Sequence, residues 1–506
     1  METPFPWLLF SGTVIFLITR AIYRVCLHPL SKIPGPKLAA TSYLYEFYYD
    51  ICIGGRFLFE IENMHRQYGP IVRINPHEIS ISDPSFYDEI YAPSSRRRDR
   101  DPKWVPGLSL PTSMIATVNH DLHRSRRAIP SNFFSKRSVI DLTPMIEERI
   151  RALIQIFEDF RQSQRPVQLD NAFAALTADI ITYYSYGKLW GFVEDADFRS
   201  DVRRSVSETS RFCHVNRLFP FIPPLIRLSP KWLKRRILSG KSSLIDFQES
   251  VFEAGAQSTE PSGTEKSELT QAGRTIFHKL NDPTLPAAER SKQRLEEESL
   301  FLLGAGTETT GSTLTVAAYY VYQDPVMLGR LRAELKPVLP RLSSSCAWSE
   351  LEQLPYLTAV LNESLRVTTP ILSRTPRVAP DETLIYKGYT IPPCTSMSTS
   401  SYFVHRNPLV FPDPDKFDPN RWIHSEGSEK LDRHLTAFGR GSGMCLGINL
   451  AYAELYMALA YIFRFVDLEI CNTGPRDMDV TREYIIGITE HGERRAFAKV
   501  IRILEE

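Results

Sequence analysis

The chain has 506 residues, which is enough for two or three average domains or for one enzyme with a large core. Its 60 basic and 59 acidic side chains leave a formal charge of +1, and this balance argues against nucleic acid as a partner. The seven cysteines are an odd number without metal-ligand spacing, which argues against a disulfide framework or a zinc finger and favours a reducing compartment.

The first 24 residues contain a strongly apolar segment. No charged residue lies between Pro4 and Thr19, and the segment reaches the roughly 20 residues of a spanning helix if it continues past Arg20. Its short length suits a thin bilayer such as that of the endoplasmic reticulum. A cleaved signal peptide is the alternative, but only Glu2 precedes the segment, so the basic n-region is missing. Basic residues follow it instead, and the positive-inside rule therefore predicts a single-pass anchor with the rest of the protein facing the cytoplasm.

A proline-rich hinge, residues 25–40, is expected to join this anchor to a body that spans residues 41–506. The run Pro34, Gly35, Pro36 forms a rigid turn that would hold the body at a fixed angle to the membrane helix. An ordinary linker is the alternative interpretation.

Helices dominate the secondary structure that we expect for the body. Residues 71–74 and 78–81 alternate in polarity and predict two short strands of a small sheet. Residues 255–290 are rich in small and charged residues and predict a surface connection. The pattern as a whole is typical of a mainly α fold with a smaller β region. Helical periodicity covers three long segments, 143–160, 171–186 and 201–212.

A longer helical pattern runs from about residue 289 to 322, a rod of about 50 Å at roughly 1.5 Å per residue. Its apolar middle, from Gly304 to Gly311, is a cluster of poor helix formers. Two of its three glycines together with its three threonines already cost on the order of 3 to 4 kcal/mol relative to alanine. Such a cost indicates a local requirement, such as close approach of a ligand to the backbone or a bulge.

Within this helix, Glu308 is a carboxylate among apolar residues, where charges are rare without a partner or a function. Beside Thr309 it forms an acid–alcohol pair suited to proton transfer. A crossing point of small residues with a snorkelling glutamate is the alternative interpretation.

A glycine-rich loop leads to Cys445. Four glycines lie in the ten residues from Phe438 to Gly447, and an apolar helical run over 448–465 follows. Glycines let the backbone approach a flat ligand closely. The free N–H groups at the helix N-terminus favour a thiolate and lower the pKa of the thiol. We therefore expect Cys445 to be a metal ligand rather than a core thiol.

Glu363 and Arg366 lie three residues apart on a helix that starts after Pro355, and hence on one face. Such pairs are usually exposed and contribute only tenths of a kcal/mol, so this motif alone is weak.

With these motifs in this order, the chain resembles the cytochrome P-450 superfamily, the haem-thiolate monooxygenases, over essentially its whole length. The resemblance implies the cytochrome P-450 fold behind one N-terminal transmembrane helix and haem b with Cys445 as axial ligand. It assigns oxygen activation to Glu308 and Thr309. It also implies a structural triad of Glu363, Arg366 and Arg421. Segments 28–30 and 403–408 resemble ascomycete enzymes of secondary metabolism, trichodiene oxygenase-like ones among them.

The resemblance further implies which residues hold the haem propionates. His123 and Arg127, four apart on one helix, hold one propionate, and Arg377 holds the second. Where the family usually has arginine or histidine two residues before the cysteine, this chain has Gly443. Arg440 is the expected substitute, provided that the loop lets its side chain reach back. Phe438, at the start of the loop, completes the expected cofactor-binding residues, which are His123, Arg127, Arg377, Phe438, Arg440 and Cys445.

The activity that the resemblance implies is insertion of one oxygen atom from O2 into a hydrophobic small molecule, a terpenoid, polyketide or alkaloid. No flavin or nicotinamide fingerprint is present, so electrons are expected from NADPH through a separate NADPH-cytochrome reductase, with cytochrome b5 as a candidate second donor. One alternative is a haem-thiolate isomerase, dehydratase or peroxide-using relative, which the pair of Glu308 and Thr309 disfavours. Another is a haem-free membrane-tethered binding protein, for which Gly443 is the only support.

Two segments are expected to form walls of the substrate pocket, 100–114 and 212–226, but their residues do not specify a ligand. Part of the second, 218–226, is apolar enough to contact a bilayer surface, with a buried loop as the alternative.

Overall fold

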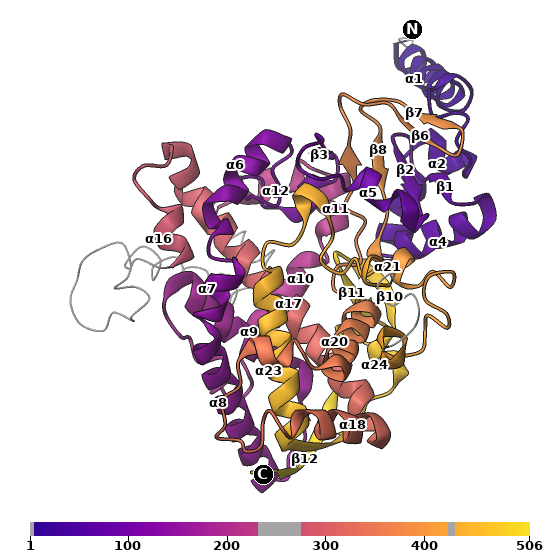
Figure 1. Ribbon diagram of the computed structural model, residues 1–506. Helices are drawn as coiled ribbons and strands as arrows, with labels where there is room; N and C mark the ends of the chain where they lie inside the picture. The colour runs from indigo at the N-terminus through magenta and orange to yellow at the C-terminus, as the bar shows by residue number, and fades with distance from the viewer. Residues whose placement is uncertain (1–4, 231–274, 424–430, 506) are drawn as a thin grey trace.

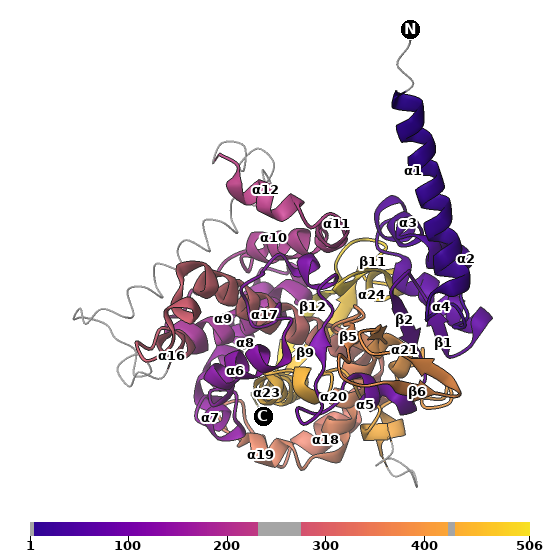
Figure 2. The same ribbon diagram turned by 90° about the horizontal axis from the view of Figure 1, so that it is seen from above.

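The computed structural model describes residues 5–230, 275–423 and 431–505, and it is mainly helical with a smaller β part (Figure 1). This confirms the predicted fold class. At the N-terminus, α1 (Phe5–Ile22) continues into a π-helical turn, Tyr23–Leu27, and projects away from the body (Figure 2). Within the described ranges, one helical segment, Phe10–Leu27, is long and apolar enough to cross a membrane.

The central element is α17 (Lys292–Gln323), which lies in the middle of the molecule and contacts α9 (Leu169–Tyr186) and α23 (Ile448–Phe465) (Figure 1). It begins slightly later than the sequence predicts, because Ala287–Arg290 form a separate 3-10 turn. Before it lie α2 (Lys37–Thr41), α3 (Leu44–Phe47), α4 (Phe57–Tyr68), α5 (Tyr87–Ile90), α6 (His120–Ser131), α7 (Lys136–Ile140), α8 (Thr143–Gln162), α9 (Leu169–Tyr186), α10 (Ser200–Ser210), α11 (Cys213–Leu218), α12 (Ile222–Leu228) and α16 (Ile276–Leu280). After it lie α18 (Pro325–Leu335), α19 (Trp348–Leu351), α20 (Pro355–Thr368), α21 (Ser401–His405), α23 (Ile448–Phe465) and α24 (Pro475–Met478).

The three predicted helices before residue 230 are present as α8, α9 and α10, and the apolar run after the cysteine loop is α23. Together with α17 and α20, the helices α8, α9 and α23 contribute to the largest hydrophobic core of the described residues. Most of the predicted surface connection at 255–290 lies outside the described residues; its end contains α16 and the 3-10 turn.

The glycines of α17 have a packing role. A Cβ on Gly306 would lie 2.8 Å from a side-chain carbon of Ile181, and one on Gly311 would lie 3.1 Å from the backbone nitrogen of Ala174. Both neighbours belong to α9, so small residues let the two helices cross closely. The crossing-point interpretation thus holds for these two glycines.

A five-stranded sheet has the order β1-β2-β8-β5-β3. The two predicted strands are β1 (Ile71–Arg73) and β2 (Glu78–Ile81), which pair antiparallel. The other members are β8 (Ser396–Ser398), β5 (Arg377–Val378) and β3 (Asp99–Arg100). The register of β3 on β5 places Arg100 directly opposite Arg377.

Three smaller sheets complete the β part of the described residues. Two C-terminal strands form a three-stranded sheet with β4 from the first half of the chain, two more C-terminal strands form a hairpin, and a second hairpin precedes β8. The strands are β4 (Val167–Gln168), β12 (Phe497–Ile503) and β9 (Val466–Cys471), β10 (Val480–Tyr484) with β11 (Ile486–Thr489), and β6 (Leu384–Tyr386) with β7 (Tyr389–Ile391).

Candidate active site

The cysteine loop is closed by its own backbone. The amide of Cys445 donates to the carbonyl of Phe438 at 2.8 Å, and the loop makes one 3-10 turn, Gly441–Gly443, before α23 begins at Ile448. Gly441 has a φ of +67°, and a Cβ there would collide with the carbonyl oxygens of Tyr91 and Ala92. Only glycine fits this conformation and this close approach.

Burial raises the pKa of the Cys445 thiol, although the Gly447 amide and the charge of Arg127 lower it. This corrects the expected lowering, because the cost of burying a thiolate outweighs the helix N-terminus. A bound metal ion deprotonates a cysteine thiol regardless of its resting pKa. The position therefore suits a ligand that becomes a thiolate when a cation arrives.

Three arginines gather near this loop without a counterion. The side chain of Arg100 contacts His123, Nη2 to Nε2 at 3.5 Å, and Arg127 is close enough to Cys445 for the two groups to shift each other's pKa. Arg377 donates to the carbonyls of Thr375 and Pro376, at 2.9 and 3.1 Å. Nowhere in the described ranges does a carboxylate pair with any of the three guanidinium groups.

Burial and the neighbouring positive charges together lower the pKa values in this cluster. Burial and then the charges of Arg377 and Arg127 hold the pKa of Arg100 well below its usual value. Burial and the charge of Arg100 lower the pKa of His123 to about 3, so its imidazole is neutral at pH 7. The Nε of Arg100 is also buried without a hydrogen-bond partner. Three cations, a neutral donor and an orphaned N–H beside a cysteine fit a group with two carboxylates and a metal ion, and haem is such a group.

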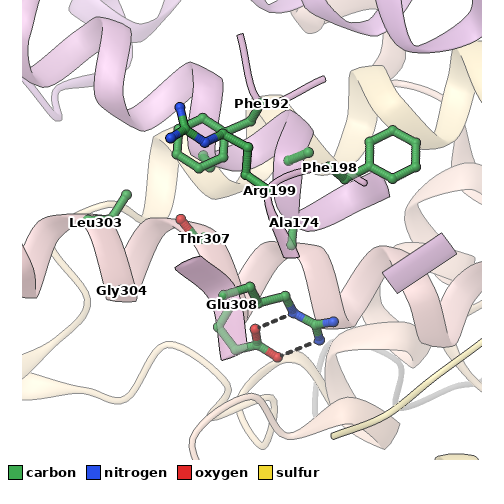
Figure 3. Close-up of a pocket in the computed structure, with 11 residues that line it drawn as sticks. Ala174, Phe192, Phe198, Arg199, Leu303, Gly304, Thr307 and Glu308 are labelled. Atoms are coloured by element: carbon green, nitrogen blue, oxygen red, sulfur yellow. Dashed lines mark hydrogen bonds and ion pairs between the residues drawn. The ribbon is translucent and has the colours of Figure 1, made fainter. Parts of the chain in front are cut away.

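Glu308 forms an ion pair with Arg203 on α10. The two side chains form a bidentate pair, with Nε to Oε2 at 2.9 Å and Nη2 to Oε1 at 3.0 Å (Figure 3). Arg203 also contacts Asp170 at 2.5 Å. The hydroxyl of Thr309 donates to the carbonyl of Ala305 at 2.7 Å, so the hydrogen bonds of the acid and those of the alcohol lead to different partners.

A cavity of about 20 Å³ lies beside this ion pair, between α9 and α17. Its volume suits about one water molecule. Thr307, whose hydroxyl is buried without a partner, is one of its lining residues, and Glu308 is another (Figure 3). A water molecule there would have polar neighbours and would extend the hydrogen-bonding reach of Glu308.

The three residues of the expected structural triad meet in the structure. Arg366 donates to both oxygens of Glu363 at 2.8 Å, and the Nε of Arg421 donates to Oε1 at 3.1 Å. The indole of Trp422 and the amide of Asp418 supply further donors, at 2.9 and 2.8 Å. The pair is buried, in contrast to a typical surface pair, and it ties α20 to the segment before the cysteine loop.

Arg440 is not brought to the arginine cluster. Its Nη1 donates to the exposed carboxylate of Asp88 at 2.9 Å. The ring of Phe438 packs against Tyr452 of α23, with centroids 5.0 Å apart. The structure thus gathers His123, Arg127 and Arg377 in one cluster and places Arg440 elsewhere.

Two residues of this region were not singled out as functional in the sequence. Arg100 belongs to a charged run, residues 96–101, which is typical of a solvated surface, and only the pairing of β3 with β5 buries it. Glu454 is a lone glutamate in the apolar run of α23, a signal that the sequence did offer. Its side chain is buried, its Oε1 has no partner, and burial raises its pKa well above the usual value despite a hydrogen bond with Thr310.

Comparisons with known proteins identify the family of the chain. The family model described as Cytochrome P450 matches residues 45–492. Conidiogenone synthase PchP450 of Penicillium rubens is 43% identical over 95% of this chain and 96% of that protein. Cytochrome P450 monooxygenase TRI4 of Trichoderma arundinaceum is 39% identical over 94% and 91% of the two chains. The crystal structure of a cytochrome P450, CYP102L1, superposes with a TM-score of 0.69 at 17% identity, over 88% of this chain and 95% of that one.

The chain therefore belongs to the cytochrome P450 family of haem-thiolate oxygenases, and it is an enzyme. Its curated relatives are fungal proteins, and several are named as monooxygenases. These matches confirm the expected family.

Proposed function

We propose that the protein is a membrane-anchored haem-thiolate monooxygenase of fungal secondary metabolism, with Cys445 as the axial ligand. The observation that carries the proposal is the cluster of three arginines without a carboxylate, two of them buried and Arg127 half-buried, beside a cysteine on a tight glycine-rich loop. Bound haem would supply the reductive activation of dioxygen and the transfer of one oxygen atom to the substrate.

The protein's own residues have distinct roles in this proposal. Arg127, Arg377 and His123 bind the haem carboxylates. Thr309 and Glu308 pass protons towards the site, by way of water rather than by a direct bond, because their hydrogen bonds lead to different partners. Electrons come from NADPH through a separate reductase, with cytochrome b5 as a second donor. The substrate is a hydrophobic small molecule, a terpenoid, polyketide or alkaloid, which is hydroxylated or epoxidised.

The arrangement of two helices supports attachment to a membrane. Both α1 and α12 project from the same side of the body (Figure 2). On α12 and just before it, Phe221, Leu225 and Leu228 are exposed by 59, 60 and 84% of their surfaces. Exposed apolar side chains beside a spanning helix fit the surface of a bilayer. We propose the endoplasmic reticulum as the location, with the body on the cytoplasmic side.

The expected anchor boundary at residue 24 lies close to the first contacts with the body. The guanidinium of Arg24 donates to the carbonyl of Thr41, and the carbonyl of Arg24 accepts from Arg73. The chain thus packs on the body from about Arg24 onward, before the proposed hinge of residues 25–40 begins.

The spectrum of the reduced, carbon monoxide-bound protein tests the haem and its ligand. The full-length protein is expected to show the red-shifted Soret band of thiolate ligation, and Cys445→Ser is expected to lose it, because a serine oxygen is a poor iron ligand. Cys394→Ser is the control, since that cysteine is exposed. A Cys445→Ser variant that keeps the band would overturn the ligand assignment. A wild type without any Soret band would favour the haem-free binding protein.

Turnover tests the reaction class. Microsomes that contain the protein and a reductase are supplied with NADPH, labelled dioxygen and a panel of terpenoids, polyketides and alkaloids. A product that gains one labelled oxygen atom supports the monooxygenase. Conversion without NADPH, or without oxygen gain, would favour the isomerase, dehydratase or peroxide-using alternative.

A further inference from the structure

We propose that the junction between α1 and the body binds the phosphate group of an anionic phospholipid. This inference rests on the membrane attachment in the proposed function, because the lipid comes from the bilayer that α1 enters. The site is a group of basic side chains, which we call the junction cluster: Arg20, Arg24, His28, Arg73, His77 and Lys103.

The length of α1 places its last turn at the level of the lipid headgroups. The helix has 18 residues and is about 27 Å long at 1.5 Å per residue, slightly less than the roughly 30 Å of a hydrocarbon core. Arg20 lies in its last turn, and Arg24 follows in the π-helical turn. Basic side chains at such positions extend into the headgroup layer. The site is therefore complete only when α1 lies in a bilayer.

The body adds basic groups around the end of α1. Arg73 of β1 donates through Nη1 to the carbonyl of Arg24 at 2.7 Å. His77, in the loop between β1 and β2, packs edge-on against His28 with ring centroids 6.5 Å apart. Burial and then the charge of Lys103 lower the pKa of His77 to about 4, so this exposed lysine also lies close by. Three parts of the chain thus meet at the end of the anchor.

No carboxylate neutralises the junction cluster by direct pairing in the part of the chain that the structure describes. Arg24 donates to the carbonyl of Thr41 instead. Arg73 is buried, its Nε has no partner, and burial followed by the charge of Arg24 lowers its pKa to about 10. Basic groups gathered without an anion are costly, and a bound phosphate offsets that cost.

Two carboxylates lie near Lys103, but both have other partners. Asp101 accepts from the backbone amide of Lys103 and from the hydroxyl of Ser396, at 2.8 and 2.6 Å. Glu78 pairs with Arg374 at 2.8 Å. The arginines and the lysine of the junction cluster therefore keep an excess of positive charge.

His28 shows that the cluster has a hydrogen-bond donor to offer. Its Nδ1 accepts from the amide of Leu30 at 3.1 Å, so the proton of the neutral ring is on Nε2. Burial and then the charges of Arg73 and Arg24 lower the pKa of His28 and keep the ring neutral at pH 7. Among the described residues nothing accepts from this N–H. Together with the exposed basic side chains it matches the several acceptor oxygens of a phosphate.

Exposed apolar side chains beside the cluster favour a phospholipid over free phosphate. Leu27 at the end of the anchor, Leu38 on α2 and Leu44 on α3 are all largely exposed. These elements follow one another in contact, from the anchor to α2 and from α2 to α3. A phospholipid would place its phosphate on the cations and its acyl chains along these leucines.

The test measures which lipids surround the full-length protein in phosphatidylcholine vesicles. Spin-labelled phosphatidic acid and spin-labelled phosphatidylcholine are compared by the fraction of each that the protein immobilises. The wild type is expected to prefer phosphatidic acid about fivefold or more. Arg20→Gln combined with Lys103→Gln is expected to bring this preference close to one, whereas Arg20→Lys combined with Lys103→Arg is expected to keep it. The matched control is Lys32→Gln combined with Lys37→Gln, because both lysines are exposed and lie outside the cluster.

Two results would overturn the site: no preference in the wild type, or an equal fall in the control, which would assign the preference to diffuse surface charge. Inorganic phosphate added at constant ionic strength is expected to leave the preference intact. Its complete loss would show that the site takes free phosphate and would overturn the lipid assignment.

Flotation with pure phosphatidylcholine vesicles separates this inference from the proposed function, and the thiolate Soret band controls for folding of each variant. If the wild type floats but shows no lipid preference, the inference fails and the membrane attachment stands. If the wild type does not float, the proposed attachment itself fails.

Discussion

Arg203 and Glu308 hold each other in a two-point ion pair, with donor–acceptor distances of 2.9 and 3.0 Å. The pair connects α10 to the middle of α17, and Asp170 of α9 makes a second contact with the same guanidinium. The carboxylate that the acid–alcohol motif assigns to proton transfer is therefore held by an arginine. Proton transfer through Glu308 requires either the opening of this pair or a water molecule in the neighbouring cavity.

Neutralising Arg203 is expected to destabilise the protein strongly. Arg203→Gln leaves the carboxylates of Asp170 and Glu308, which are 1 and 14% exposed, without their cation. Removing one partner of a buried ion pair costs about 3 to 5 kcal/mol. Denaturant unfolding of the holoprotein measures the loss. Arg204→Gln is the matched control, because Arg204 is the exposed neighbour on the same helix. Equal stabilities of the two variants would show that the network contributes little.

Thr309→Ala is expected to keep haem binding but to divert reducing equivalents to hydrogen peroxide, because the hydroxyl that we propose for proton transfer is lost. The measurement is NADPH consumed per product formed, together with peroxide released. Thr315→Ala is a suitable control, since its hydroxyl makes the same kind of bond, to the carbonyl of Gly311 at 2.8 Å. If both variants couple NADPH to product as the wild type does, Thr309 serves helix packing alone.

The sequence predicts the bounds of the helices better than it predicts which charged side chains pair with each other. The run that forms α23 is apolar apart from Asn449, Glu454 and Arg464 and follows a glycine, so its bounds were predictable from periodicity and breakers. The partner of Glu308 was not predictable, because Arg203 lies on a different helix and 105 residues away. Arg100 was missed for a similar reason: its burial depends on the register of two short strands, which local patterns do not specify.

Two buried glutamates are expected to differ in how much stability the protein loses when each is replaced by glutamine. Glu363 receives donors from Arg366, Arg421, Trp422 and the backbone, so Glu363→Gln leaves buried guanidinium groups without an anion and costs about 3 kcal/mol or more. Glu454 has no cationic partner and an elevated pKa, so Glu454→Gln removes no ion pair and is expected to change stability by about 1 kcal/mol or less below about pH 4.5, where the carboxyl carries little charge.

The pH dependence of Glu454 gives a second check. Its folded-state pKa is raised above the unfolded value, so its contribution to stability is fully present below about pH 4.5 and declines as the pH rises towards the folded pKa. Glu454→Gln is therefore expected to gain stability relative to the wild type between pH 5 and 7, as measured by thermal unfolding. A relative loss over that interval would mean that the carboxyl is ionised in the native protein and has a partner.

Removing residues 1–19 is expected to release most of the protein from membranes, because most of the candidate spanning helix is lost. The fold is expected to remain, because the shortened chain still contains Arg24 and its contacts with the body. Binding that persists is assigned to α12. The triple variant Phe221→Ser, Leu225→Ser, Leu228→Ser in the shortened chain is expected to abolish it, since these side chains are exposed and apolar. Flotation with liposomes measures both steps, and the Soret band controls for folding. If the shortened triple variant still floats at high salt, another surface binds the membrane.

Protonation of His405 at low pH is expected to break a hydrogen bond that holds the segment before the cysteine loop. Its Nε2 accepts a hydrogen bond from the amide of Thr436 at 2.9 Å, and its Nδ1–H faces the hydroxyl of Thr369, also at 2.9 Å. A protonated ring cannot accept from Thr436. Burial and the nearby charge of Arg366 hold the pKa of His405 well below its usual value. This depressed pKa means that the contribution of His405 to stability is present above about pH 6.5 and is lost as the pH falls below it.

The comparison of the wild type with His405→Gln isolates this effect, because glutamine keeps an acceptor but does not titrate in this range. The stability advantage of the wild type is expected to shrink by up to about 1.4 kcal/mol for each pH unit below pH 6.5. His491→Gln is the control, since His491 is exposed and pairs with Asp477 at the surface. Because Thr436 lies only nine residues before Cys445, haem loss is expected to accelerate over the same pH interval in the wild type and less steeply in His405→Gln. A stability difference that does not vary with pH would show that Thr436 keeps its bond when the ring is protonated, and hence that the imidazole does not sense acid at this position.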